Sequence, residues 1–166
     1  ICTMFEKRYS IGVGALTNSL VAAGFSGTFC VGYRGPLPSW LDQCTVEVAG
    51  ERWRVGGLTL HFIRMETADH FTNHKPQFML RLFDQQAQRM FYLDPDIVVK
   101  CRWDFIEEWT SDAVSLCADI HAQCPVGQPL RRAWERYFAP HGLHFRQQLN
   151  TYVNGGFIGV SRTHRS

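Results

Sequence analysis

The sequence has no long run of charge of one sign. Charged residues make up 19% of the chain, and its formal net charge is +2. Nucleic-acid-binding proteins, and proteins that bind membranes through polybasic segments, rely on clustered positive charge, so both classes are disfavoured. We therefore expect the partner to be recognised by a local site and not by the bulk charge of the protein.

Long apolar segments are also missing. No stretch approaches the roughly 20 apolar residues that cross a bilayer. The start, ICTMF, has no basic segment followed by a long apolar one, so we expect neither a membrane span nor a signal peptide. Because the first residue is Ile1 and the end, SRTHRS, directly follows an apolar run, we also expect the sequence to be a fragment of a longer protein.

The six cysteines include no CxxC pair. They are scattered, and several lie inside apolar runs such as TFCVGY and VSLCAD. This distribution favours reduced, buried thiols in a cytoplasmic protein over a disulfide framework. Cys117, His121 and Cys124 have a loosely ligand-like spacing, but a structural zinc site needs four well-placed ligands, so zinc is not expected.

Strand-like and helix-like patterns alternate along the chain. Short apolar runs typical of strands, and a hairpin around Gly50, are found at residues 1–5, 27–33, 44–55, 58–65, 89–94, 113–119 and 152–160. Helical spacing is found at residues 9–23, 76–86, 103–109 and 130–138. With 45% hydrophobic residues, the chain can form a real core. We predict one α/β domain over residues 1–166, with a mainly parallel central sheet and helices on both faces.

The first helical segment carries two further expectations. Its apolar and small residues, including Ile11, are spaced as on one helix face, and Gly24 can end the helix. Gly12 and Gly14, in GVGAL, lack the third glycine of a dinucleotide-binding fingerprint and lie inside the helical pattern. We therefore do not expect NAD to bind.

The stretch FYLDPDIVV, residues 91–99, places two carboxylates at the end of an apolar run. In extended backbone Asp94 and Asp96 point the same way, and Pro95 restricts both its own backbone and that of Asp94. Close carboxylates repel unless a cation joins them, and Mg²⁺ or Mn²⁺ held this way usually shares its ligands with water and substrate phosphates. The pattern favours a phosphorylated substrate, with an Asp-capped turn as the alternative. Residues 97–100 are predicted to continue the strand.

Four stretches, in this order, resemble the glycogenin-like and bacterial lipopolysaccharide galactosyltransferase-like group of nucleotide-sugar glycosyltransferases. They are TMFEKRYSIGVGALTNSL, NHKPQFMLRLF, RMFYLDPDIVVKCRWDFIEEW and YVNGGFIGVSR. The resemblance implies a Rossmann-like GT-A fold and a metal-dependent hexosyltransferase. It further implies transfer of a sugar from a nucleotide diphosphate, UDP in particular, to a hydroxyl of a glycan, lipid or protein, with retention at the anomeric carbon.

The resemblance also assigns roles to single residues. In the first stretch, the implied nucleotide contacts are Thr3, Met4, Phe5 and Tyr9. Lys75 in the second stretch is the implied donor-contacting lysine. In the third, Asp94 and Asp96 are the implied ligands of Mn²⁺ or Mg²⁺, with Asp94 also near the ribose. From the residues alone, Tyr9 could equally pack in the core, and Lys75 could be an ordinary solvated lysine.

The catalytic candidates come from the last third of the chain. In the fourth stretch, Asn154, Gly155 and Gly156 are implied to lie beside the sugar, with Asn154 a candidate for catalysis and a simple bulge as the alternative. Asp119 ends an apolar run and is the second catalytic candidate, as a residue that binds the sugar hydroxyls or assists the acceptor. Its alternative role is to cap the following turn.

Two features of the family have no counterpart here. The downstream His-x-x-Gly-x-x-Lys-Pro type motif, which supplies a third metal ligand, is absent, and His164 lacks its context. The Asp-Gln helix that follows the Asn-Gly strand is also absent, so we expect the C-terminal part of the domain to be missing. Two other functions stay open: a haloacid-dehalogenase-like phosphohydrolase with Asp94 as nucleophile and Asp96 as acid/base, and a non-catalytic nucleotide-binding module.

Overall fold

The computed structural model describes residues 1–44, 46–47, 51–84, 87–111, 113–119, 127–144 and 152–164. The chain divides into two compact units. The first comprises Ile1–Ser115 with Gly156–Ser166, and the second comprises Leu116–Gly155.

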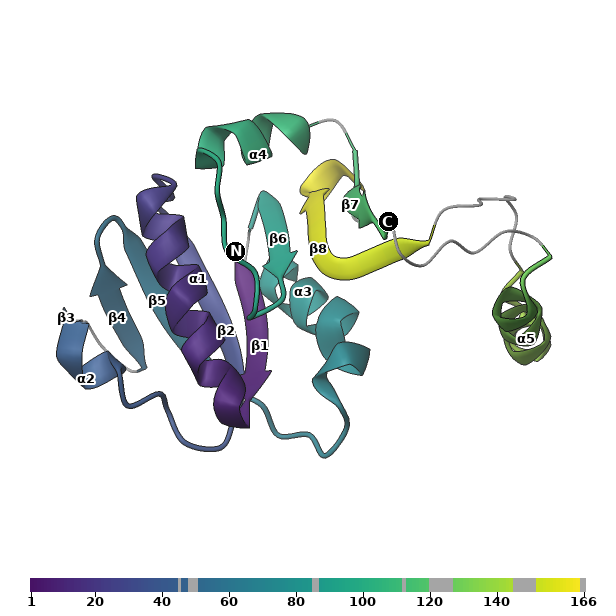
Figure 1. Cartoon of the computed structure of the whole chain (residues 1–166), viewed down its shortest axis with the longest axis horizontal. Helices are drawn as coiled ribbons and strands as arrows, with labels where there is room; N and C mark the ends of the chain where they lie inside the picture. Colours follow the sequence, from purple (N-terminus) through teal and green to yellow (C-terminus); the bar gives the residue numbers. More distant parts are fainter. Residues whose placement is uncertain are drawn as a thin grey trace. The chain divides into compact units, whose positions relative to one another are not determined.

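The strands form a mixed sheet with a parallel centre, which belongs to the first unit except for residues 116–118 and 153–155 (Figure 1). Its central strands, in spatial order, are β5 (Leu58–Arg64), β2 (Thr28–Arg34), β1 (Cys2–Glu6) and β6 (Arg89–Leu93). Antiparallel neighbours follow on both sides: β4 (Arg52–Val55) and β3 (Val46–Glu47) next to β5, and β8 (Val153–Ser161) next to β6. The strand order ends with β7 (Ser115–Ala118) next to β8.

The helices of the described chain are α1 (Ser10–Ala22), α2 (Leu41–Cys44), α3 (Lys75–Asp84), α4 (Trp103–Trp109) and α5 (Pro129–Phe138). Short 3₁₀ turns are found at Lys7–Tyr9, Phe71–His74, Ala139–His141 and Arg162–His164. None of these helices is long and apolar enough to cross a bilayer.

Strand residues alternate between the two faces of the sheet, as side chains do along extended backbone. Phe5 and Phe91 belong to the core cluster that includes side chains of α1 and α4. Met4 and Tyr92, each next to one of them in sequence, belong to the second cluster, which includes side chains of α3. This arrangement confirms the predicted α/β fold with helices on both faces.

β1 and β6 are staggered. The two strands pair where Cys2 lies opposite Tyr92. Because β6 ends at Leu93, the residues of β1 after Thr3 extend beyond the end of β6. A step therefore lies between the carboxyl ends of the two strands.

α1 buries only part of the face that the sequence predicts, because Leu16, Ser19 and Leu20 are buried but Ile11 is not. Val13, Leu16 and Leu20 are its buried apolar residues, whereas 74% of Ile11 is exposed. The helix is oriented by Gly12, where an added Cβ would lie 2.2 Å from the carbonyl oxygen of Pro95. No side chain fits between α1 and this turn, so the glycine must face it and Ile11 is directed outward.

Residues 97–100 do not continue β6, so this prediction was wrong. The amide of Ile97 donates to the carbonyl oxygen of Asp94 at 3.1 Å, which closes a turn. The amide of Val99 then donates to the hydroxyl of Ser19 in α1 at 3.0 Å. The segment is apolar because Ile97 and Val99 pack against the core cluster beneath α1.

The second unit contains most of β7, the helix α5 and the first part of β8. The side-chain oxygen of Gln128 accepts a hydrogen bond from the amide of Arg131 at 3.0 Å and caps the start of α5. Trp134 stacks on Tyr152 with ring centroids 5.8 Å apart. The amide of Asp119 donates to the carbonyl oxygen of Tyr152 at 2.8 Å.

Cys2, Cys30, Cys101 and Cys117 are free thiols, as predicted. The prediction that the thiols are buried holds for Cys2 but is wrong for Cys101 and Cys117, which are exposed, while Cys30 is half-buried. His121 and Cys124, the other members of the spacing that was weighed for zinc, lie outside the described residues.

Candidate functional site

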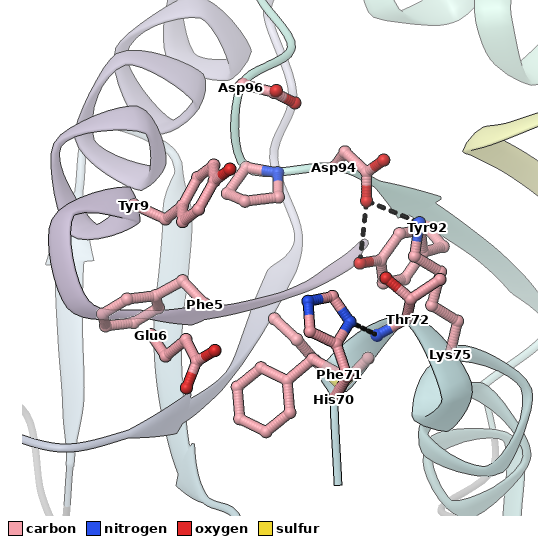
Figure 2. Close-up of a pocket in the computed structure, with 12 residues that line it drawn as sticks. Phe5, Glu6, Tyr9, His70, Phe71, Thr72, Lys75, Tyr92, Asp94 and Asp96 are labelled. Atoms are coloured by element: carbon pink, nitrogen blue, oxygen red, sulfur yellow. Dashed lines mark hydrogen bonds and ion pairs between the residues drawn. The ribbon is translucent and has the colours of Figure 1, made fainter.

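A pocket occupies the step between the carboxyl ends of β1 and β6 (Figure 2). The chain crosses from β1 to β2 on one side, while β6 lies on the other side of β1. In open α/β sheets, ligands bind outside the carboxyl ends of the strands where the direction of winding reverses. The pocket has this position.

Asp94 is fixed at the end of β6 by its backbone and by its side chain. Its amide donates to the carbonyl oxygen of Gly156 in β8 at 2.7 Å. Its Oδ1 accepts hydrogen bonds from Nζ of Lys75 at 2.7 Å and from the hydroxyl of Tyr92 at 3.1 Å. Figure 2 shows both contacts on the same carboxylate oxygen, with the other oxygen directed away from the pair. The Lys75 side chain is only 12% exposed, so this ion pair is largely shielded from water.

Tyr92 contacts Lys75 as well as Asp94. Nζ of Lys75 lies 4.7 Å from the centroid of the Tyr92 ring, a cation–π distance. Burial raises the pKa of Tyr92, and the charge of Asp94, its hydrogen bond and the charge of Asp96 raise it further. The phenol therefore stays protonated at neutral pH and donates to Asp94.

Asp94 and Asp96 fit a divalent cation that shares its ligands with a phosphate. Both carboxylates line the pocket, and Asp96 is exposed. Across the ranges that the structure describes, no group of three or more His, Cys, Asp or Glu side chains gathers to hold a metal ion. Mg²⁺ is commonly held by one or two carboxylates, with water and substrate phosphates as its other ligands. Two carboxylate ligands from the protein are therefore enough for a Mg²⁺ site that is completed by water and substrate phosphates.

Arg34 fixes the opposite wall of the pocket. Its guanidinium donates twice to Oε2 of Glu6, through Nε at 3.0 Å and through Nη2. It also donates to the carbonyl oxygen of Thr67 and lies 4.9 Å from the ring centroid of Phe71. The hydrogen bond from Arg34 holds the pKa of Glu6 below its usual value. An ionised carboxylate and an aromatic ring are thereby held at the pocket wall.

Residues predicted from the sequence make up half of this pocket. The structure brings together Met4, Phe5, Tyr9, Lys75, Asp94 and Asp96. Gly156 is adjacent, through its hydrogen bond with the amide of Asp94. Thr3 is fully buried and does not line the pocket. Asn154, Gly155 and Asp119 belong to the second unit, and their roles stay predictions.

Five other lining residues were not predicted from the sequence: Glu6, His70, Phe71, Thr72 and Tyr92. A signal was present for Tyr92, because it lies two positions before Asp94 on a strand and so shares its side of the sheet. No local signal marked the segment that contains Phe71. Its position depends on the hydrogen bond of the loop before it to Arg34, which is 33 residues from Thr67 in sequence.

Comparison with known proteins identifies the fold. No protein-family model matches the chain, and no curated protein sequence matches it significantly. The apo structure of the bifunctional glycosyltransferase WbbM aligns with a TM-score of 0.57 and 15% identity, over 96% of this chain and 30% of that one. The galactosyltransferase LgtC, in complex with donor and acceptor sugar analogues, aligns with a TM-score of 0.56 and 16% identity, over 96% and 56%. This chain thus spans about a third of the first structure and just over half of the second, and its fold is the GT-A fold that the sequence resemblance implied.

Proposed function

We propose that this chain is the donor-binding part of a metal-dependent glycosyltransferase that takes its sugar from a nucleoside diphosphate, UDP in particular. The observation that carries the proposal is the gathering of Tyr9, Lys75, Asp94 and Asp96 around one pocket of a GT-A sheet. These residues provide an aromatic ring, a cation and two carboxylates. A base, a diphosphate and a divalent cation require groups of these kinds.

Each part of the donor has a partner of suitable chemistry in the pocket. Tyr9 is 46% exposed, and its ring offers a stacking surface for a base. Lys75 offers a cation to the diphosphate. Asp94 and Asp96 hold Mn²⁺ or Mg²⁺, which when bound neutralises the charge that develops on the diphosphate leaving group.

The acceptor side of the reaction belongs to the same proposal. The acceptor is a hydroxyl of a glycan, lipid or protein, and the transfer retains the configuration at the anomeric carbon. Asn154 and Asp119 are the candidates for catalysis, and Gly155 provides an exposed backbone that a sugar can approach closely. Gly156 is buried and supports the site through its carbonyl oxygen, which accepts the amide hydrogen bond of Asp94. We place this activity in the cytoplasm because the cysteines in the described ranges are free thiols.

Calorimetric titration of UDP, with and without Mn²⁺, tests the proposal. We expect UDP to bind in the presence of Mn²⁺ and to lose at least about ten-fold in affinity when the metal is omitted or Asp96 is replaced by Ala, a change of about 1.4 kcal/mol. Glu108→Ala is the control, because Glu108 is an exposed carboxylate of α4 outside the pocket. The proposal fails if UDP does not bind with Mn²⁺, or if Asp96→Ala binds it as tightly as the unmodified chain.

A further inference from the structure

Tyr92 contacts both charged groups of the pocket through different parts of its side chain. Its hydroxyl donates to Oδ1 of Asp94 at 3.1 Å, and its ring face lies 4.7 Å from Nζ of Lys75. Lys75 in turn donates to the same Oδ1 at 2.7 Å. The three side chains therefore form a closed set of contacts, which Figure 2 shows beneath the turn that contains Asp94 and Asp96.

The tyrosine is the fixed member of this set. Only 1% of Tyr92 is exposed, and it packs in the core cluster that contains Phe78 and Met79 of α3. Its strand is paired on both sides, because Tyr92 lies opposite Cys2 of β1 and Ile158 of β8. Asp94 and Lys75 border the pocket, with 31% and 12% of their side chains exposed, so the buried phenol is the most constrained of the three side chains.

The contacts fix the orientation of the Asp94 carboxylate. Both donors use Oδ1, which satisfies that oxygen within the protein. An ionised carboxylate can accept on both of its oxygens, so the second one stays available. With Oδ1 fixed, rotation about the last side-chain bond of Asp94 is restricted. The second oxygen is therefore held in the direction that Figure 2 shows, away from Lys75 and Tyr92.

We propose that Tyr92 is the positioning residue of the cation site, and this inference rests on the proposed function. By binding Oδ1 of Asp94, its hydroxyl reserves the second carboxylate oxygen for the divalent cation. Through its ring face it also keeps Lys75 beside the pocket. Partners that orient a metal ligand in this way typically contribute 10- to 100-fold to metal affinity.

A purely structural role for Tyr92 predicts a different result. A buried tyrosine hydroxyl needs a hydrogen-bond partner, and in a purely structural role Asp94 serves only that need. Tyr92→Phe removes the hydroxyl and keeps the ring, its burial and its contact with Lys75. In a structural role the substitution lowers stability alone. In a positioning role it also weakens Mn²⁺ binding.

Tyr33 provides a matched control for this substitution. It is fully buried in β2, and its hydroxyl donates to a carboxylate oxygen of Glu51 at 2.8 Å. Neither residue lines the pocket. Tyr33→Phe therefore removes the same atom and the same type of hydrogen bond at a place where no cation is proposed.

The test is a titration of Mn²⁺ into each protein at a fixed UDP concentration, with free Mn²⁺ measured by electron paramagnetic resonance. We expect Tyr92→Phe to raise the dissociation constant of Mn²⁺ about ten-fold and Tyr33→Phe to leave it unchanged. Thermal unfolding should show a similar loss of stability in both variants. UDP binding without metal should be unchanged in Tyr92→Phe, because the ring still lies beside Lys75.

The outcomes separate this inference from the function on which it rests. If the unmodified chain binds no Mn²⁺ in the presence of UDP, the proposed function is refuted and the inference is refuted with it. If the unmodified chain binds Mn²⁺ and Tyr92→Phe binds it equally well, the positioning role alone is overturned. A ten-fold loss that also appears in Tyr33→Phe would overturn it too, because the effect would then come from general destabilisation.

Discussion

Gly12 allows a direct test of how the turn at the pocket is held. An added Cβ would lie 2.2 Å from the carbonyl oxygen and 3.0 Å from the carbonyl carbon of Pro95. Both are backbone atoms, so no side-chain rotation relieves the contact. To restore an ordinary van der Waals distance, α1 and the turn must separate by roughly 1 Å. Asp94 and Asp96 flank Pro95 in this turn, so they must move with it.

Two opposing terms set the size of the effect of Gly12→Ala. Alanine is favoured over glycine inside a helix by about 1 kcal/mol. Overpacking a tight contact costs about 1–3 kcal/mol. Gly14 separates the two terms, because on the same helix an added Cβ would meet only the side chain of Trp40, at 3.3 Å. We expect the free energy of unfolding of Gly12→Ala to be lower than that of Gly14→Ala by about 1–3 kcal/mol.

Urea denaturation followed by circular dichroism measures this difference, and calorimetry with UDP and Mn²⁺ measures its effect on the pocket. Gly12→Ala should weaken Mn²⁺-dependent UDP binding, since the displaced turn contains both carboxylates. Gly14→Ala should leave binding unchanged. Equal stability and equal binding in the two variants would refute the idea that contact with α1 holds the turn in place.

Two further predictions concern the charged groups of the pocket. Lys75→Met should strengthen the binding of Mn²⁺ alone and weaken the binding of UDP, because the ammonium repels a cation at Asp94 and attracts a diphosphate. Electron paramagnetic resonance titration measures the Mn²⁺ affinity and calorimetry measures the UDP affinity. Changes of the same sign in the two affinities would contradict the prediction. The hydrogen bond from Arg34 lowers the pKa of Glu6 in the folded protein. The ionised form of Glu6 therefore stabilises the fold above its unfolded pKa of about 4.3, and this stability is lost as the pH falls below that value. Urea denaturation between about pH 6 and pH 3 should therefore show a steeper loss of stability for the unmodified chain than for Glu6→Gln, and parallel curves would argue against a contribution from this pair.

Local patterns were sufficient for the fold class and for the two carboxylates Asp94 and Asp96, whereas Lys75 was assigned only by the family resemblance and Glu6 was not predicted. The apolar runs at 2–5 and 89–93 are buried strands, and the acidic residues that follow the second run mark its carboxyl end. The burial of α3 was also predictable, because Phe78, Met79, Leu82 and Phe83 are spaced as on one helix face. These features depend on residues that are close together in the sequence.

The parts that could not be predicted depend on contacts between distant segments. Residues 97–100 have the composition of a strand. The hydrogen bond from the amide of Val99 to Ser19, 80 residues away, and the packing of Ile97 and Val99 against the core direct them along α1 instead. The orientation of α1 depends in the same way on the approach of Pro95 to Gly12. A single sequence contains no record of which distant segment will lie against a given glycine, so the direction of Ile11 could not be inferred.

The stagger between β1 and β6 determines that a pocket is present at all. β1 continues beyond the last residue of β6, and the three residues that extend furthest, Met4, Phe5 and Glu6, all line the pocket. The space is thus a consequence of the register offset between two strands of five residues each, and was not formed by small side chains. Substitutions of lining residues should change which ligand fits, whereas a longer β6 would replace the pocket by sheet. Insertions before Asp94 are therefore predicted to be far more harmful than substitutions at the same positions.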